Sequence, residues 1–241
     1  MNEYIIENLT LLVPSKDDSL NLINNFHSIE NYLISKVKNY EIIIISNGSS
    51  ESDINSINKL VENNIHTKHL VYEKKGKGFA INKGVQEAKY NNILFSDADF
   101  SVAIQEFDKF VENNKLKADL VIGSRKIKNS LNLNSPIRRK ITGAVFTLLV
   151  RSLFNISVKD TQCGFKAFRI DSFGEHRHEE DGFVFDVELI LLAKLQKLEI
   201  LEIPVKYTHQ DRSTVSIFKD SIKMVIGIFR IFKNYKLSKN Y

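Results

Sequence analysis

The chain has 241 residues, of which 43% are hydrophobic, with a single cysteine and a formal net charge of +5 at pH 7. A chain of this length buries a sizeable core without disulfides, and one cysteine excludes a disulfide framework or a cysteine-based zinc site within the chain. The N-terminal segment has acidic residues and lacks the apolar core of a signal peptide. A membrane-spanning helix needs ~20 apolar residues, and Arg151 interrupts the best candidate segment, 141–158, so no transmembrane helix is expected.

Apolar runs alternate with helical patterns, which predicts an α/β fold with a largely parallel sheet covered by helices. Pro14 is expected to stop the first strand. Strands are predicted at Leu9–Val13, Glu41–Ser46, Lys68–Tyr72, Asn92–Ser96 and Leu120–Ser124. Helices are predicted to begin near Asp18 and to cover Asp53–Asn63, Phe79–Lys89 and Ile104–Asn114.

The second half of the chain has a less regular pattern. A long helix is predicted at Arg138–Ile156, a strand at Glu199–Tyr207, and a final amphipathic helix at Ser216–Tyr235. There is no internal repeat and no low-complexity linker, so residues 1–241 are expected to form a single domain. Its last element is a basic amphipathic helix over about 215–235.

Two carboxylates, Asp97 and Asp99, follow directly after a predicted buried strand. Ligands of open α/β sheets bind beyond the carboxyl ends of the strands, and two carboxylates at this spacing suit a hard divalent cation. Such a cation can neutralise a diphosphate leaving group as a Lewis acid. The alternative is a helix cap followed by a turn, because aspartate serves both.

A basic stretch without acidic residues extends from Leu120 to Lys159 and favours an anionic partner such as a phosphate or an acidic membrane. Within it, 141–156 is apolar around most of its circumference, apart from a stripe of Thr147, Arg151 and Asn155. This segment is either a core helix or a helix at a bilayer surface. The last helix is predicted to place Val225 and Phe229 on an apolar face, together with Phe218, Ile222 and Phe232. Basic helices of this kind bind membranes or partners, or pack on their own domain.

Several short motifs follow one another along the chain: L-L-V-P at 11–14, E-I-I-I-I-S-N-G-S-S at 41–50, K-G-K-G-F-A at 75–80, F-S-D-A-D at 95–99, G-S-R at 123–125, D-T-Q-C-G-F-K at 160–166, F-D-V-E at 185–188 and E-I-P-V at 202–205. These motifs resemble those of glycosyltransferase family 2, in particular its dolichyl-phosphate glucosyltransferase and mannose synthase branches. The string at 160–166 is the most specific of them.

The resemblance implies a GT-A (Rossmann-like) fold and an inverting hexosyltransferase that needs Mg²⁺ or Mn²⁺. The implied donor is a nucleotide-diphosphate sugar similar to UDP-glucose, and the implied acceptor is a polyprenyl (dolichyl) phosphate at the cytoplasmic face of a membrane, contacted peripherally. Metal and diphosphate would be held by Asp97 and Asp99. The donor would be bound by Pro14, Asp18, Asn47, Lys77 and Asp97. The acceptor phosphate would be held by Arg125, Arg139 and Gln162, and arginine suits that role because its planar fork pairs two phosphate oxygens.

The chain departs from the family pattern where the base of the donor is expected to bind. Ser46 and Asn47 stand where family members carry two aspartates, and the second of these aspartates accepts a hydrogen bond from the nucleobase. The amide of Asn47 can accept or donate, so the base preference is open. Ser101 stands where the mannose synthase branch has a metal-binding glutamine, which points away from that branch.

Two other functions remain open at this stage. A hydroxyl acceptor on a saccharide or cell-wall polymer would require a general base, for which Asp160, Asp186 and Glu188 are candidates, although each also suits a capping or turn role. A non-catalytic nucleotide-binding or interaction module is the other alternative, and intact Asp97 and Asp99 argue against it. A nucleic-acid partner is not expected, because no RNA-binding or helix-turn-helix motif occurs.

Overall fold

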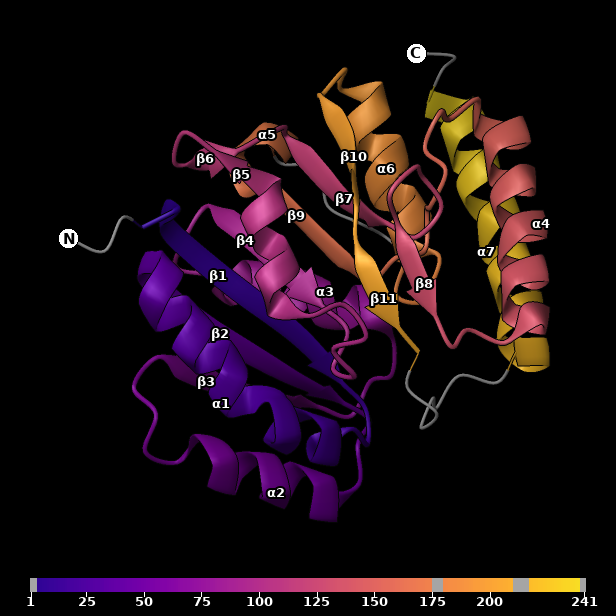
Figure 1. Cartoon of the computed structure of the whole chain (residues 1–241). Helices are drawn as coiled ribbons and strands as arrows, with labels where there is room; N and C mark the ends of the chain where they lie inside the picture. Colours follow the sequence, from indigo (N-terminus) through magenta and orange to yellow (C-terminus); the bar gives the residue numbers. More distant parts are fainter. Residues whose placement is uncertain (1–3, 175–179, 210–216, 239–241) are drawn as a thin grey trace.

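The structure, a computed structural model, describes residues 4–174, 180–209 and 217–238, and in the helices it leaves out the side chains of 139–140, 217–222 and 235–238. A seven-stranded sheet with strand order β10-β7-β9-β4-β1-β2-β3 forms the centre, and helices cover both of its faces (Figure 1). This confirms the prediction of a single α/β unit built on a mostly parallel sheet.

The elements have the following bounds. The large sheet contains β1 (Ile6–Ser15), β2 (Val37–Asn47), β3 (Thr67–Tyr72), β4 (Asn92–Ser96), β7 (Leu120–Ser124), β9 (Phe165–Arg169) and β10 (Ile200–Pro204). Two small sheets pair β5 (Val111–Glu112) with β6 (Lys115–Leu116) and β8 (Leu131–Leu133) with β11 (Lys206–Thr208). The helices are α1 (Ser19–Lys36), α2 (Glu51–Val61), α3 (Lys77–Glu87), the 3-10 helix η1 (Ile104–Phe110), α4 (Ile137–Phe154), α5 (Ile170–Phe173), α6 (Phe185–Leu195) and α7 (Ile217–Ser238).

The central strands contain uninterrupted apolar runs, such as Leu11–Val13 and Ile42–Ile45, because both faces of the sheet are buried. Successive side chains of a strand point to opposite faces, so Leu11 and Val13 pack in one cluster and Leu12 in the other. The first cluster includes side chains of α1, α2 and η1, and the second includes side chains of α3, α4, α6 and α7. Uninterrupted apolar runs are typical of parallel strands buried in this way.

The strand register brings three strand ends to one edge of the sheet. β1 pairs in parallel with β2 as far as Ser15 opposite Ser46, and with β4 through Leu12 opposite Phe95. The chain thus leaves β1, β2 and β4 at neighbouring points, where the strand order turns from one side of β1 to the other. Ligands of open α/β sheets bind at such a point.

Two expectations for the first half are wrong in detail. β1 continues through Pro14 to Ser15, because a proline near a strand end removes only one ladder donor. The predicted helix at Ile104–Asn114 is a 3-10 helix that ends at Phe110, followed by the β5–β6 hairpin. Asn113 and Asn114 form its turn with φ of 50° and 61°, a conformation that asparagine tolerates and that suits a tight hairpin.

The second half contains elements that the sequence pattern does not reveal. β9 lies antiparallel between β4 and β7, and α6 is buried on nearly all sides, so it lacks the amphipathic period of a surface helix. The single strand predicted at Glu199–Tyr207 is two strands in different sheets. Pro204 ends β10, and the N–H of Val205 then donates to the carbonyl of Ser124 while the chain turns into β11.

Helices α4 and α7 lie side by side at one edge of the molecule (Figure 1). Along α4, four apolar side chains at helical spacing are each more than half exposed: Ile137, Ile141, Val145 and Leu148. Thr147, from the predicted polar stripe, is instead buried and accepts a hydrogen bond from Lys126 Nζ. Of the predicted apolar face of α7, Phe232 packs against the core, whereas Val225 and Phe229 are exposed, and the side chains of Phe218 and Ile222 lie outside the described residues. Ile228 and Ile231, which that face did not include, are buried. In the described residues, no helix is both long and apolar enough to cross a bilayer.

Candidate active site

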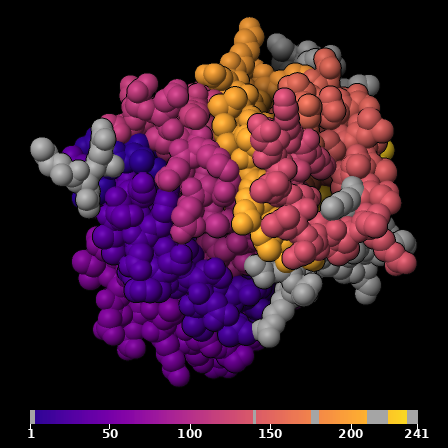
Figure 2. Space-filling model, in the orientation of Figure 1, coloured from indigo at the N-terminus to yellow at the C-terminus, as the bar shows by residue number. Residues whose placement is uncertain are grey.

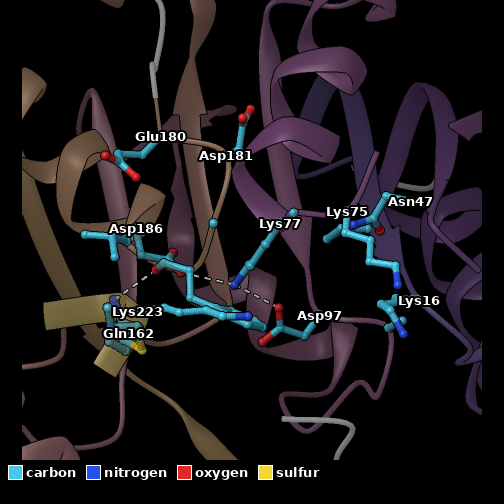
Figure 3. A pocket seen from close by; sticks show the side chains of 18 of the residues that line it. Lys16, Asn47, Lys75, Lys77, Asp97, Gln162, Glu180, Asp181, Asp186 and Lys223 are labelled. Carbon is cyan, nitrogen blue, oxygen red and sulfur yellow. Dashed lines mark hydrogen bonds and ion pairs between the residues drawn. The ribbon is translucent and has the colours of Figure 1, made fainter. Parts of the chain in front are cut away.

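A cavity of about 770 Å³ opens at the carboxyl edge of β1, β2 and β4 and is closed on the far side by α6 and α7. Its walls include nearly all of the side chains that the sequence singles out: Pro14, Asp18, Asn47, Lys77, Asp97, Asp99, Arg125 and Gln162. Arg139 lies in α4, and its side chain is outside the described residues. Figure 3 shows Lys16 and Lys75 near Asn47 on one side of the cavity and Lys223 near Gln162 on the other.

The carboxylate pair is held by the segment that follows β4. The N–H of Asp97 donates to the carbonyl of Gly164 at 3.0 Å, which joins this segment to the D-T-Q-C-G-F-K motif. Asp99 accepts hydrogen bonds from the N–H and the hydroxyl of Ser101, at 2.9 and 2.8 Å. A Cβ at position 164 would lie 1.7 Å from Asp97 Oδ2, so only glycine fits beside this carboxylate.

A buried ion-pair network extends from Asp97 into the protein. Lys77 Nζ lies 2.9 Å from Asp97 Oδ1 and 3.2 Å from Asp186 Oδ2 (Figure 3). The second oxygen of Asp186 pairs with Lys166, whose Nζ also donates to the carbonyl of Cys163 at 2.6 Å. Sequence reasoning missed Lys166, because a lysine within an apolar strand signals a buried partner only when its neighbours in space are known.

The pKa values of Asp97 and Asp99 are shifted in opposite directions. Burial acts to raise the pKa of Asp97, but the Lys77 ammonium outweighs it and holds that pKa below its usual value. Burial and the charge of Asp97 raise the pKa of Asp99, although Ser101 opposes the shift. Burial, reinforced by Asp99, also raises the pKa of Asp18 to about 6. Negative charge is therefore under-compensated around Asp99 and Asp18.

This surplus of negative charge fits a divalent cation. In the part of the chain that the structure describes, no group of three or more His, Cys, Asp or Glu side chains is arranged to hold a metal ion. Mg²⁺-type ions typically bind through one or two carboxylates together with substrate phosphates and water. Asp97 and Asp99 therefore fit a metal ion whose other ligands come mostly from a diphosphate and water.

Arg125 forms an ion pair with the buried carboxylate of Asp160. Its Nε and Nη2 donate to the two oxygens of Asp160 at 2.7 and 2.8 Å, its backbone N–H donates to the same carboxylate, and its guanidinium lies over the ring of Tyr207. Burial acts to raise the pKa of Asp160, but Arg125 outweighs it and lowers that pKa to about 2. The Nη1 group of Arg125 is not used by Asp160, and the residue lines the cavity.

The three carboxylates considered as general bases are engaged in structural contacts. Asp160 pairs with Arg125, Asp186 lies between two lysines, and Glu188 accepts a hydrogen bond from the N–H of Glu180. A general base must have an oxygen within reach of the proton that it removes. The geometry therefore does not favour a mechanism in which one of them removes a proton from a hydroxyl.

The opposite wall of the cavity comes from α7 and from the segment before α6. Lys223, Met224 and Arg230 line it, and Arg230 pairs with Glu180 at 3.2 Å. Sequence reasoning assigned the basic residues of α7 to a membrane or a partner, and it missed that two of them reach the cavity. Only the tertiary fold brings α7 back over the strand ends.

At the other end of the cavity, Asn47 and Ser46 face different surroundings. Asn47 lines the cavity and is 5% exposed. Ser46 is fully buried, and its hydroxyl lies 2.8 Å from Nε2 of His69, which in turn contacts Asn58. Of Ser46 and Asn47, only Asn47 is therefore placed to contact a ligand in the cavity.

A mostly parallel sheet with a polar crevice at its carboxyl edge is the architecture of the GT-A glycosyltransferases. The chain belongs to glycosyl transferase family 2, whose family model matches residues 10–177. It is 30% identical to a dolichyl-phosphate beta-glucosyltransferase of Dictyostelium discoideum over 98% of this chain and 78% of that protein. It is 28% identical to the Homo sapiens dolichyl-phosphate beta-glucosyltransferase, over 90% of this chain and 72% of that protein.

Solved structures show the same fold. The glucosyl-3-phosphoglycerate synthase of Mycobacterium tuberculosis in complex with UDP superimposes with a TM-score of 0.70 and 12% identity, over 94% of this chain and 80% of that chain. A complex of that enzyme with Mn²⁺ and UDP-glucose gives a TM-score of 0.69 over the same shares. The fold prediction is confirmed, and family membership identifies the chain as a glycosyltransferase.

Proposed function

We propose that this glycosyltransferase transfers glucose from UDP-glucose, or a close analogue, to a dolichyl or other polyprenyl phosphate at a membrane surface. The relatives at 30% and 28% identity are named for the same acceptor class. The observation that carries the proposal is one cavity with the Asp97–Asp99 pair on one wall and the cations of α7 on the other, where α7 packs against α4 and its exposed apolar stripe.

The chemistry suits an acceptor that needs no general base. A phosphate monoester has a second pKa of about 6, so it is largely ionised at neutral pH. One of its oxygens attacks the anomeric carbon, the bond from that carbon to the diphosphate oxygen breaks, and the nucleoside diphosphate leaves with inversion. The engagement of Asp160, Asp186 and Glu188 in structural contacts agrees with a reaction in which none of them removes a proton.

The side chains in the cavity divide into those facing the donor and those facing the acceptor. Asp97 and Asp99 would hold Mg²⁺ or Mn²⁺, which when bound stabilises charge on the leaving diphosphate as a Lewis acid. Pro14, Asp18, Asn47 and Lys77 would bind the donor. Nη1 of Arg125 would contact the acceptor phosphate together with Gln162, Arg139 and Lys223. Positioning two anions in this way is the main task of the protein.

The exposed stripe of α4 supports peripheral membrane contact. Its four apolar side chains lie in the stretch that has no acidic residue and several arginines and lysines. An apolar face beside basic groups is typical of helices that lie in the bilayer interface. The prenyl chain of the acceptor could then remain in the bilayer while its phosphate enters the cavity.

The test is transfer by the purified chain, with radiolabelled UDP-glucose and Mn²⁺, to dolichyl phosphate, to dolichol and to a soluble saccharide. We expect a glucosylated lipid phosphate only with the first acceptor, and Arg139→Ala should raise the KM for that acceptor. Transfer to the saccharide alone would replace this proposal with the hydroxyl-acceptor alternative. Absence of transfer from every nucleotide sugar, with nucleotide still bound, would favour the non-catalytic module.

A further inference from the structure

Lys77 joins two carboxylates that come from distant parts of the chain. Its ammonium contacts Asp97, which follows β4, at 2.9 Å, and Asp186, in the first turn of α6, at 3.2 Å. All three residues border the cavity, but the side chains of Lys77 and Asp186 are only 9% and 2% exposed, whereas that of Asp97 is 46% exposed. Of these two contacts, only the one with Asp97 is open to an incoming ligand.

The contact with Asp186 is the fixed one. Asp186 also pairs with Lys166, which is fully buried and held by the carbonyl of Cys163. Removing Asp186 from this arrangement would leave a buried ammonium without a counter-charge, which is strongly unfavourable. Two lysines and two aspartates therefore balance each other before any ligand enters, and the exchangeable contact is the one between Lys77 and Asp97.

This balance affects how a divalent cation can reach Asp97. A cation that arrives alone must compete with the Lys77 ammonium for the same carboxylate and is repelled by it. A diphosphate removes the conflict, because its oxygens give the ammonium an alternative partner and give the cation further ligands. Cation and diphosphate should therefore bind together much better than either binds alone.

We propose that Lys77 is an exchangeable counter-ion. It holds Asp97 while the cavity is empty, and it moves to the diphosphate when metal and donor enter, while staying bound to Asp186. This inference rests on the proposed function in one respect, namely that the ligand is a diphosphate. It assigns the order of binding: a divalent cation enters together with the diphosphate and not before it.

The experiment measures Mn²⁺ binding by electron paramagnetic resonance or calorimetry, without any transfer reaction. Lys77→Met should bind Mn²⁺ alone about tenfold more tightly than the wild type, because the competing charge is gone. The same variant should bind UDP in the presence of Mn²⁺ about ten- to a hundredfold more weakly, because a charge-assisted contact is lost. A merely structural lysine would weaken both affinities and would not change them in opposite directions.

Three further variants test this interpretation. Lys77→Gln removes the charge but keeps a hydrogen-bond donor for both carboxylates, so it serves if Lys77→Met does not fold. Lys83→Met, on the same helix but outside the cavity, should leave both affinities unchanged. In an Asp97→Asn background, Lys77→Met should no longer tighten Mn²⁺ binding, because the contested carboxylate is absent.

The outcomes separate this inference from the proposed function. If Lys77→Met and Lys77→Gln bind Mn²⁺ alone no more tightly than the wild type, the counter-ion exchange is wrong, while glucosyl transfer can still occur. If the wild type binds neither UDP nor inorganic pyrophosphate in the presence of Mn²⁺, both the exchange and the proposed function fail. Opposite changes in a protein that does not glucosylate dolichyl phosphate would support the exchange and reject the acceptor.

Discussion

The segment from β1 to β4 and the segment from β7 to α7 contribute to the same cavity by different means. The first uses parallel strands that end at one edge, so that short polar side chains such as Asn47 and Asp97 follow directly from the core. The second uses an antiparallel strand, buried ion pairs and two helices with exposed apolar side chains. Figure 2 shows the two segments on opposite sides of the molecule, in indigo to purple and in salmon to orange.

Under the proposed function, the first segment would bind the soluble anionic donor, and the second would bind the lipid acceptor. In the first segment, changes should affect nucleotide and metal while leaving lipid binding intact. In the second segment, changes should affect stability and membrane contact before they affect the nucleotide.

The largest effect is expected at Asp99. Asp99→Asn keeps the shape of the side chain but removes a charge that would hold the metal, so transfer should fall by roughly a thousandfold, equivalent to several kcal/mol of lost charge stabilisation. Chelation of divalent ions with EDTA should reduce the wild type to a similar level. Asp171→Asn, at an exposed aspartate far from the cavity, is the control and should be active. Full activity of Asp99→Asn, or of the wild type in EDTA, would contradict the assignment of the metal site.

The next effect concerns the point where the two segments touch. Gly164→Ala would place a Cβ 1.7 Å from Asp97 Oδ2, so the carboxylate must move. A displacement of a catalytic group by about 1 Å can reduce the rate about a hundredfold. Gly143→Ala is the matched control, because its Cβ meets no atom within 4 Å and alanine is favoured over glycine in a helix by about 0.5–1 kcal/mol. Equal activities of the two variants would show that Asp97 does not need its present position.

The third effect is on stability and belongs to the second segment. The folded-state pKa of Asp160 is about 2, below the unfolded value of 3.8, so its pairing with Arg125 stabilises the protein above pH ~4 and is lost as the pH falls through the folded pKa. Asp160→Asn should therefore reduce the free energy of unfolding by about 2 kcal/mol near neutral pH, and the difference from the wild type should shrink towards pH 2. Chemical denaturation at several pH values measures it. A difference that does not depend on pH would contradict the assignment.

This buried pair also limits how Arg125 can be tested as an acceptor residue. Arg125→Ala would leave Asp160 charged and buried without a partner, which typically destabilises a protein by about 3–5 kcal/mol. A loss of activity in that variant would not separate binding from unfolding. Arg125→Lys keeps the charge and loses the bidentate geometry, so it is the informative substitution.

Comparison of the two segments also explains how much the sequence could predict. In the first, strands and helices follow from apolar runs and their spacing, and the strand ends place Pro14, Asn47 and Asp97 together through a general rule of open α/β sheets. In the second, β9 is a short strand containing Lys166, and α6 is buried on nearly all sides. Neither has the period on which such predictions depend.

Buried partners set a second limit on prediction. The sequence singles out Arg125 and Asp186, but it does not indicate that Asp160 and Lys166 neutralise them, because these partners lie in separate elements that meet only in the folded sheet. For a similar reason, the sequence does not identify Ile228 and Ile231 as the buried side chains of α7. The helix has apolar residues on more than one side, and only packing against α4 and α6 decides which of them is buried.

A smaller effect is expected on membrane binding. The double substitution Val145→Ser and Leu148→Ser removes two exposed apolar side chains of α4, so binding to phosphatidylcholine vesicles containing phosphatidylserine should weaken about tenfold. Vesicle co-sedimentation measures this, and thermal unfolding should change little because neither side chain is in the core. Ile65→Ser, at a fully exposed isoleucine of the first segment, should bind like the wild type. If both proteins bind vesicles equally, α4 is not the contact.

The smallest expected effect concerns the choice of base, and it tests whether the first segment alone reads the nucleotide. Asn47 lines the cavity, and its amide can donate one hydrogen bond and accept another, whereas a carboxylate can only accept. Uracil presents an N–H beside carbonyl oxygens, so an amide can pair with both groups, while guanine presents adjacent N–H groups that suit a carboxylate. Asn47→Asp should therefore shift the ratio of UDP to GDP affinity towards GDP by about fivefold, since a hydrogen bond contributes about 1 kcal/mol.

Calorimetry with both nucleotides and Mn²⁺ gives this ratio of affinities. Ser46→Ala is the control, because the hydroxyl of Ser46 contacts His69 and does not line the cavity. An unchanged ratio in Asn47→Asp, or an equal shift in both variants, would remove Asn47 from base recognition.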